Sequence, residues 1–252
     1  MSEQQQEHFF CITEQLSQQF AFLVSEGTRI TLADMSLLID VAPTLPLPER
    51  LKNILSAQEV TQLSKFSLRK RYLEWLSGRI TAKLCLSTLM QQEQHKNFTL
   101  ADFSILPDDL GRPVVVGINN PPTLSISHSG TYAVAMASRA PQCGVDIQSI
   151  SPTLEKVAAR FTNQEEKSLF CDNHNALESL AIIWATKEAV KKSMLSDHPE
   201  VFSITHIQQA EKRNQYWKVT CSIATQPSRS AVVHVTTFDT TVLACTTGGH
   251  HA

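Results

Sequence analysis

The sequence is poor in glycine and proline, which excludes the fibrous and the disordered classes of protein. Its 252 residues include 8 Gly and 11 Pro, while hydrophobic residues make up 42%. Collagen-like and low-complexity chains contain far more glycine and proline. A chain of this length and hydrophobic content can bury a sizeable core without disulfides or metal ions, as one large domain or as two smaller ones.

Cysteine pairs, long apolar runs and an excess of positive charge are also absent from the sequence. The 6 cysteines are scattered and form no CxxC pair, which disfavours a zinc ribbon and a disulfide framework. No apolar run approaches the roughly 20 residues that a membrane helix needs, and the polar N-terminus is unlike a secretory signal. With 22 Lys+Arg against 24 Asp+Glu, the net charge of −2 disfavours a general nucleic-acid-binding protein. We therefore expect a cytoplasmic protein that binds neither nucleic acid nor a membrane.

The expected helices repeat once along the chain. Residues 56–59 and 162–165 both have the spacing of a capping box, in which an N-cap hydroxyl and a glutamate three residues later bind each other's backbone N–H groups. The first box precedes a helix predicted over 63–90. The second opens a helix through 170, and a longer helix over 176–194 follows it. Short strands are predicted over 113–117, 124–127, 132–137, 145–147, 217–223, 232–238 and 241–245.

This repetition favours a chain of two similar halves, because Trp75 and Trp184 lie at matching positions on the long helices. The period is far too long for a solenoid. The sequence therefore predicts an α+β fold with two similar α/β subdomains in a pseudo-twofold arrangement within one chain. The N-terminal subdomain is expected over 1–140 and the C-terminal subdomain over 141–252.

Apolar residues in the first half of the helix over 176–194 recur at the spacing of a buried helical stripe. In one interpretation the helix then emerges into solvent and Lys187 pairs with a neighbour. In the other, a carboxylate and several lysines line a cleft and face an anionic ligand. The stripe continues as the charged residues Lys187, Glu188, Lys191 and Lys192.

The segment Gly144–Gln148 has the pattern of a strand whose Asp146 and Gln148 point to the same face. Two oxygen-bearing side chains on one face suit a hard cation such as Mg²⁺. An ordinary half-exposed strand has the same pattern, so the segment by itself does not establish a metal site.

The segment Ser125–Gly130 is dense in hydroxyl groups and contains a histidine. Ser127 and His128 invite comparison with a serine hydrolase, but the G-x-S-x-G spacing of a nucleophile elbow is missing. On a strand these neighbours point to opposite faces, so they are badly placed to act as nucleophile and base. Contact with a phosphate through hydroxyl and imidazole groups fits the composition better.

Basic residues gather between 65 and 83, where six Lys and Arg accompany a single acidic residue, Glu74. Such a run is usually a solvated helix face. Here Arg71, Trp75, Gly78 and Arg79 share one side at helical spacing. That side offers cations and a small residue for the close approach of a ligand.

Taken in order, these segments resemble the Sfp-type 4′-phosphopantetheinyl transferase family. The resemblance covers roughly residues 65–195, whereas the first 60 residues and the C-terminal strands carry no motif. The matching segments are Arg69–Arg79, Gly111–Pro113, Ser125–Gly130, Gly144–Gln148, Phe161–Glu165 and Trp184–Ala189.

The resemblance implies transfer of the phosphopantetheine arm of coenzyme A (CoA) to a serine of an apo acyl, aryl or peptidyl carrier protein, with release of 3′,5′-ADP. Such carriers serve fatty-acid, polyketide and nonribosomal-peptide synthesis. The resemblance also implies a monomer whose CoA and metal site lies at the interface of its two halves.

The resemblance also implies catalytic roles by position. Asp146 and Glu188 would hold Mg²⁺, with Gln148 at a third position, and Lys192 would act beside them on a phosphate. Glu165 and Glu188 are both candidates for the base that takes the proton of the carrier serine. Glu165 also has the position of an ordinary capping-box glutamate.

Nucleotide-binding roles follow in the same way. Phosphate contacts would come from Arg112, His128, Lys187 and Lys192. Ser127 would help to seat the nucleotide. The 3′-phosphoadenosine end of CoA would be bound by Arg71 and Arg79.

One position departs from the family pattern, since many members have glutamate where this chain has Gln148. An amide is a neutral and weaker Mg²⁺ ligand, so we expect altered metal affinity or a preference for Mn²⁺. The departure favours an alternative function, a catalytically weak relative that binds CoA or a carrier as a regulatory or assembly module. The presence of Asp146, Lys187 and Glu188 argues against that alternative.

Overall fold

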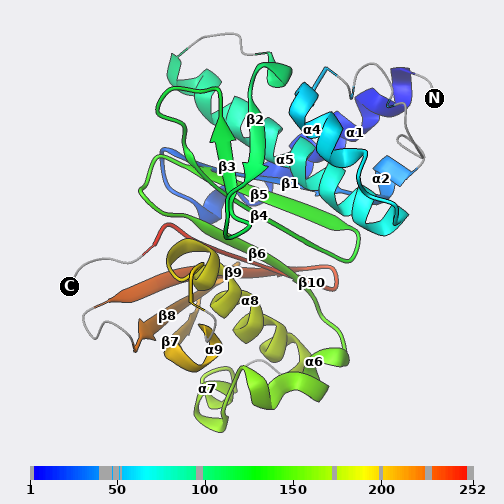
Figure 1. Cartoon of the computed structure of the whole chain (residues 1–252). Coiled ribbons are helices and arrows are strands. Elements are labelled where there is room, and N and C mark those ends of the chain that lie inside the picture. Colours follow the sequence, from blue (N-terminus) through cyan, green and yellow to red (C-terminus); the bar gives the residue numbers. More distant parts are fainter. Residues whose placement is uncertain are drawn as a thin grey trace. The chain divides into compact units, whose positions relative to one another are not determined.

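A computed structural model describes residues 3–39, 47, 51, 53–94, 99–171, 175–198, 201–224 and 229–248. The chain divides into two compact units, Met1–Ala140 and Pro141–Ala252. Each unit packs helices on antiparallel strands, so the predicted α+β fold class is confirmed (Figure 1). The pseudo-twofold arrangement and the CoA site shared by both halves stay predictions.

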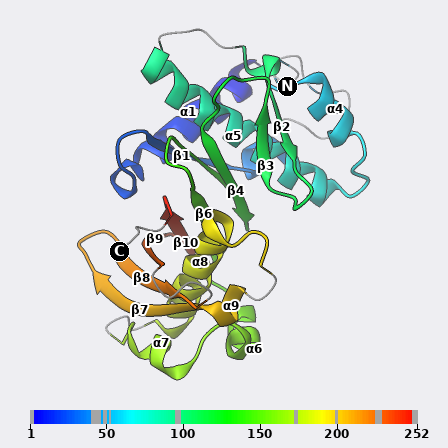
Figure 2. The ribbon, with the colours of Figure 1, turned by 60° about the vertical axis from the view of Figure 1, so that its left-hand side comes forward.

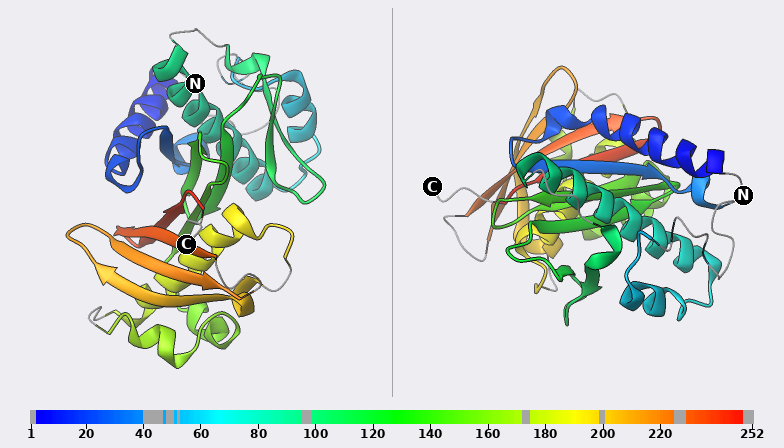
Figure 3. Two further views of the ribbon diagram at one scale, coloured as in Figure 1. Left: turned by 90° about the vertical axis from the view of Figure 1, so that its left-hand side faces the viewer. Right: turned by 90° about the horizontal axis from the view of Figure 1, so that it is seen from above.

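In the first unit, the long helix α5 (Arg69–Gln94) packs on a three-stranded sheet (Figure 3). The strand order is β1–β5–β4, and both pairs are antiparallel. Leu76 and Ile80 of α5 are fully buried because apolar residues recur on one face of the helix. The three strands are β1 (Thr28–Asp34), β4 (Thr123–Ser129) and β5 (Tyr132–Ser138).

The other elements of the first unit surround this sheet. Helix α1 packs along β1, and the hairpin of β2 and β3 contacts β4 through β3 (Figure 3). The elements of this unit that were not predicted from the sequence include α1, β1 and β2. The additional elements are α1 (Glu3–Gln18), η1 (Ala21–Leu23), α2 (Ser36–Ile39), α4 (Ala57–Leu63), η2 (Leu100–Asp102), β2 (Ser104–Pro107) and β3 (Pro113–Val116).

The helix predicted over 63–90 is wrong at its start, because α4 ends at Leu63 and α5 begins at Arg69. Ser64 stands at the C-cap of α4, where its hydroxyl donates to the carbonyl of Thr61. Such local side-chain bonds compete with continuation of a helix. The capping box that opens α4 is confirmed. The hydroxyl of Ser56 accepts from the backbone N–H of Glu59, and the carboxylate of Glu59 accepts from the backbone N–H of Ser56.

In the second unit, helix α8 packs across a five-stranded antiparallel sheet of order β6–β10–β9–β8–β7 (Figure 2). The predicted bounds of α8 are confirmed, and the predicted alternation of β8 is confirmed by the burial of Trp217, Val219, Cys221 and Ile223. Strand β7 was not predicted. The elements are β6 (Gly144–Ser149), α6 (Thr153–Val157), η3 (Ala158–Arg160), α7 (Gln164–Ser168), α8 (Ala176–Met194), α9 (Val201–Ile204), β7 (Thr205–Lys212), β8 (Trp217–Ile223), β9 (Ser230–Phe238) and β10 (Thr241–Thr246).

Gly144 allows β6 to lie directly against α8. A Cβ at this position would overlap the carbonyl oxygen of Ala189 and would lie 2.9 Å from Cβ of Ser193. Backbone cannot yield to such an overlap as a flexible side-chain end could, so only glycine permits this approach. The glycine therefore sets how closely the residues that follow it on β6 approach the last turns of α8.

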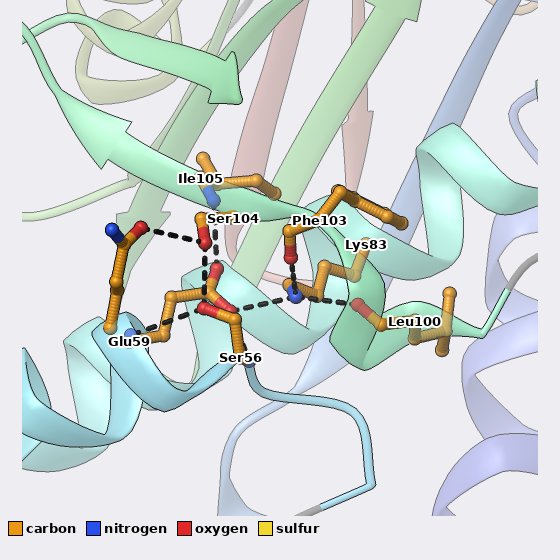
Figure 4. A network of polar contacts seen from close by, with 8 residues as sticks. Ser56, Glu59, Lys83, Leu100, Phe103, Ser104 and Ile105 are labelled. Atoms are coloured by element: carbon orange, nitrogen blue, oxygen red, sulfur yellow. Dashed lines mark hydrogen bonds and ion pairs between the residues drawn. The ribbon is translucent and has the colours of Figure 1, made fainter. Parts of the chain in front are cut away.

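Each unit holds a buried Glu–Lys ion pair between its short capped helix and its long helix. In the first unit Nζ of Lys83 lies 2.7 Å from Oε2 of Glu59, and both side chains have no exposed surface (Figure 4). In the second unit Nζ of Lys187 lies 2.8 Å from Oε1 of Glu166, and the exposed fractions are 2% and 4%. These pairs connect α4 with α5 and α7 with α8.

The two glutamates also bind equivalent strands. Oε1 of Glu59 accepts a hydrogen bond from the backbone N–H of Ile105 on β2 at 2.9 Å. Oε1 of Glu166 accepts one from the backbone N–H of Ile207 on β7, also at 2.9 Å. The same three-way connection of short helix, long helix and following strand thus occurs in both units, which supports the predicted repeat.

Candidate functional site

Strand β6 and the last turns of α8 bring an acidic and a basic side chain together in the second unit. Asp146 is 5% exposed on β6, and Nζ of Lys192 on α8 lies 2.7 Å from its Oδ1. A hydrogen bond between two charged groups is short and strong, and burial strengthens it further. The close packing at Gly144, two residues earlier on β6, positions this contact.

Glu188 lies one helical turn before Lys192, so the two share a face of α8. Nζ of Lys191 lies 3.2 Å from Oε1 and 3.4 Å from Oε2 of Glu188, whose side chain is 13% exposed. Gln148 follows on the same face of β6 as Asp146, and its Nε2 donates to the carbonyl of the next residue at 2.9 Å. Two carboxylates, an amide and two lysines therefore gather on facing elements, which we call the β6–α8 cluster.

The predicted phosphate contact of Lys187 is not supported by the described contacts, which give its ammonium group an internal partner. Its ammonium group is 2% exposed and is bound by both oxygens of Glu166 at 2.8 and 2.9 Å, with the carbonyl of Phe202 at 3.5 Å. The charged stripe of α8 therefore does not emerge into solvent at Lys187, and a ligand phosphate cannot replace this partner without leaving Glu166 buried and unpaired.

The second capping box, predicted over 162–165, is wrong, because α7 begins one residue later. Asn163, rather than Thr162, is the N-cap of α7, and its side chain accepts from the N–H of Glu166 at 2.9 Å. Both positions carry a cap residue three residues before a glutamate, and asparagine is the stronger N-cap, which is the signal that the sequence offered.

Because α7 begins one residue later than predicted, the roles expected of its two glutamates differ in the structure. Glu166 is buried and pairs with Lys187, whereas Glu165 is exposed on α7. The capping role considered for Glu165 is therefore wrong. The described contacts link Glu165 to neither Asp146 nor Lys192.

A cleft of about 270 Å³ lies in the first unit between α5, the turn before β3, and β4. The sequence predicted that Arg71, Trp75, Gly78 and Arg79 share one side of α5. This is confirmed, because all four line the cleft. The complete lining is Phe66, Arg71, Glu74, Trp75, Gly78, Arg79, Gly111, Pro113, Ile126 and His128.

Arg79 is the most strongly buried cation of this cleft. Burial lowers its pKa to about 10, although the negative charge of Glu59 acts in the opposite direction. Its guanidinium lies 4.7 Å from the ring centre of Trp75, and its Nε is buried without a hydrogen bond among the described residues. A cation with so little compensation favours an anion in the cleft.

Glu74 faces two of the other lining residues. Its Oε2 lies 3.1 Å from Nη1 of Arg71, and its Oε1 lies 3.9 Å from Nδ1 of His128 on β4. His128 is directed to this side, whereas Ser127 is 7% exposed and belongs to the opposite face of the strand. The serine and the histidine therefore do not form the nucleophile and base of a hydrolase.

Arg112 does not line the cleft, although Gly111 and Pro113 on either side of it do. Its Nε lies 2.6 Å from Oδ2 of Asp108 within the same turn. Desolvation pushes the pKa of Asp108 upward, but hydrogen bonds from the side chain and backbone of Arg112 and from the N–H of Leu110 leave that pKa below its ordinary value. In this structure the guanidinium is therefore part of the turn rather than of the cleft wall.

Lys83 does not belong to the basic surface expected between 65 and 83. Besides Glu59, its ammonium group binds the carbonyls of Leu100 and Phe103 at 2.6 and 2.5 Å (Figure 4). Burial lowers the pKa of Lys83, and the hydrogen bond with Glu59 opposes that shift. Lys83 is therefore an internal structural residue of the first unit.

The described parts of the chain contain no group of three or more His, Cys, Asp or Glu side chains suited to a metal ion. None of their helices combines the length and the hydropathy required to span a membrane.

Comparison with known proteins identifies relatives of part of the chain. The family model described as 4′-phosphopantetheinyl transferase superfamily matches residues 142–246. A holo-[acyl-carrier-protein] synthase of Staphylococcus carnosus is 34% identical over 89 residues, which cover 35% of this chain and 74% of the relative. The enzyme of the same name from Exiguobacterium sp. is 32% identical over 96 residues, covering 38% of this chain and 78% of the relative.

Solved structures of proteins with the same description are also similar to part of the chain. A holo-(acyl-carrier-protein) synthase from Bacillus anthracis in complex with CoA (3′,5′-ADP) is 24% identical, with a TM-score of 0.39 and coverage of 44% of this chain and 92% of that one. Asp146, Glu188 and Lys192 lie within the residues that the family model matches. On the matches to the family model and to the two sequence relatives, the chain belongs to the 4′-phosphopantetheinyl transferase superfamily.

Proposed function

We propose that this chain transfers the 4′-phosphopantetheine arm of CoA to a serine of an apo carrier protein and releases 3′,5′-ADP. The relatives are named holo-[acyl-carrier-protein] synthases, so an acyl carrier protein is the first substrate to test. Aryl and peptidyl carriers are proposed as further substrates on the resemblance alone.

The observation that carries the proposal is the β6–α8 cluster. Attack on a pyrophosphate requires cations for the phosphate oxygens, fixed positions for the reacting groups and a base for the nucleophile. Lys192, held by Asp146 at 2.7 Å, supplies a positioned cation. Glu188, one turn earlier on the same helix face, supplies a carboxylate beside it.

The donor set of the cluster fits Mg²⁺, which the resemblance implies. Asp146, Glu188 and Gln148 offer carboxylate and amide oxygens, the ligands that this hard cation prefers, and two carboxylates with several waters are a common arrangement for it. Mg²⁺ bound there would neutralise charge on the pyrophosphate oxygens. Lys191 and Lys192, which contact these carboxylates, would supply further cations for the phosphates.

Of the two glutamates considered as base, we propose Glu188. It shares the cluster with Lys192, whereas Glu165 is exposed on α7 and is linked to the cluster by none of the described contacts. A carboxylate that accepts the serine proton must reach the nucleophile directly or through one water. Glu188→Gln should therefore abolish transfer, while Glu165→Gln should retain it.

We further propose that the cleft of the first unit binds the 3′-phosphoadenosine end of CoA. Arg71, Arg79 and His128 line it and supply donors for a phosphate. Trp75 offers an aromatic face, and Gly78 adds no side chain to the wall of the cleft. Lys187 and Arg112, which were expected to contact phosphates, have internal partners and are omitted from this proposal.

The decisive experiment is incubation of the protein with CoA, Mg²⁺ and an apo acyl carrier protein, followed by mass spectrometry of the carrier. The expected result is a carrier heavier by one phosphopantetheine group, together with 3′,5′-ADP. Measurable CoA binding without modification of several carriers would instead favour the binding module that was considered as the alternative.

The matched variants are Asp146→Asn and Asp197→Asn. The first removes the charge that holds Lys192 and is offered to the metal, so transfer should fall by at least about a hundredfold, or more than 2.7 kcal/mol of the barrier. Asp197 lies after α8, outside the cluster, and its variant should retain activity. An active Asp146→Asn protein would contradict the assignment of the site.

A further inference from the structure

We propose that Glu74 is a positioning residue of the cleft in the first unit, and that it holds Arg71 and His128 in place for a phosphate group of the ligand. The inference rests on the proposed function, which assigns a nucleotide to this cleft. Glu74 is the single acidic residue of the basic run over 65–83, and the proposed function gives it no role.

The geometry shows a carboxylate between two cationic or potentially cationic groups. Oε2 of Glu74 accepts from Nη1 of Arg71 at 3.1 Å, and Oε1 lies 3.9 Å from Nδ1 of His128. Arg71 belongs to the same helix one turn earlier, whereas His128 belongs to β4. The carboxylate therefore spans two elements of the cleft wall.

Glu74 is less exposed than the two side chains that it contacts. The side chain of Glu74 is 13% exposed, compared with 66% for Arg71 and 37% for His128. A third contact, to Lys70 at 3.8 Å, reaches a side chain that is 86% exposed and adds little. Glu74 is thus the least exposed member of the group, and the more exposed side chains of Arg71 and His128 contact it.

The negative charge of Glu74 has two opposite effects on the binding of an anionic ligand. A carboxylate in the wall of an anion-binding cleft repels the ligand, so its charge by itself weakens binding. A long arginine side chain that is free in solvent must lose conformational freedom when it binds a phosphate. Glu74 can offset its repulsion only by removing that cost in advance, because its contact already holds the guanidinium at the cleft.

These two effects predict opposite results for Glu74→Gln. If charge alone mattered, loss of the carboxylate would tighten the binding of an anionic nucleotide. If Glu74 positions Arg71 and His128, the affinity for 3′,5′-ADP falls about tenfold, as expected for the loss of one charge-assisted hydrogen bond. Glu74→Asp keeps the charge and should recover part of the affinity.

The experiment is isothermal titration of the full chain with 3′,5′-ADP and with 5′-AMP at one ionic strength. The extra phosphate of 3′,5′-ADP should account for most of the loss in Glu74→Gln, so 5′-AMP should be affected less. Asp109→Asn is the matched control, since it removes the same charge from the exposed turn beside Gly111 and leaves the contacts of Glu74 unchanged. Its affinity for 3′,5′-ADP should be unchanged or slightly higher.

Transfer kinetics supply a second readout. Glu74→Gln should raise KM for CoA about tenfold and leave kcat unchanged at saturating CoA, because the residue does not touch the reacting atoms. Equal or tighter binding of 3′,5′-ADP by Glu74→Gln would overturn the inference and leave the proposed function intact. Failure of the unaltered chain to bind either nucleotide would overturn both.

Discussion

Loss of the ammonium group of Lys187 should destabilise the protein rather than merely weaken its affinity for CoA. In Lys187→Met, the carboxylate of Glu166 stays buried and, among the described residues, keeps only the N–H of Ile207 at 2.9 Å as a partner. Removal of one member of a buried ion pair typically costs about 3–5 kcal/mol. With a urea m-value of about 3 kcal/mol/M, the unfolding midpoint should fall by about 1–1.7 M.

The assay is urea unfolding followed by circular dichroism, with Lys191→Met as the matched control. Lys191 lies one turn later on the same helix, but its side chain is 41% exposed and its pair with Glu188 is a surface pair. The free energy of unfolding of this control should change by less than about 1 kcal/mol.

A double variant tests the cause of the loss. In Lys187→Met with Glu166→Gln, the remaining group is neutral and its amide oxygen can still accept from Ile207, so most of the lost stability should return. A fully stable Lys187→Met protein that no longer binds CoA would refute this reasoning and restore the phosphate contact predicted from the sequence.

Three further results are expected. Gly144→Ala should destabilise the chain by about 1–3 kcal/mol and slow transfer, because the new methyl group would force β6 away from the carbonyl of Ala189; denaturation and the carrier assay check both effects. Gln148→Glu should lower the Mg²⁺ concentration for half-maximal transfer, and an unchanged requirement would eliminate Gln148 from the metal site. At pH 8 a thiol reagent should label Cys11 and Cys171 quickly and the four buried cysteines only after unfolding. Thiolate is the reactive form, and burial raises the pKa of two of those four to about 12, so their labelling should stay slow until the pH approaches that value.

Local sequence patterns predicted the elements that carry the candidate site. The alternation of β8, the bounds of α8 and the capping box at Ser56 all depend on neighbours within a few residues, and each is confirmed. The same local rules placed Asp146 and Gln148 on one face of β6, and Glu188 and Lys192 on one face of α8. A residue's face follows from its spacing alone, so no tertiary information was needed.

The sequence by itself determined the α+β class, the repeat and the superfamily's motifs, because periodicity, capping and motif spacing are properties of neighbouring residues. Only the tertiary structure decided which charges are available to a ligand. Lys83 and Lys187 have the same local pattern as exposed lysines, and each becomes internal because a glutamate more than 20 residues earlier is folded against it. Nothing within a helix reports such a partner, since the energy of a buried charge depends on what distant elements bring to it.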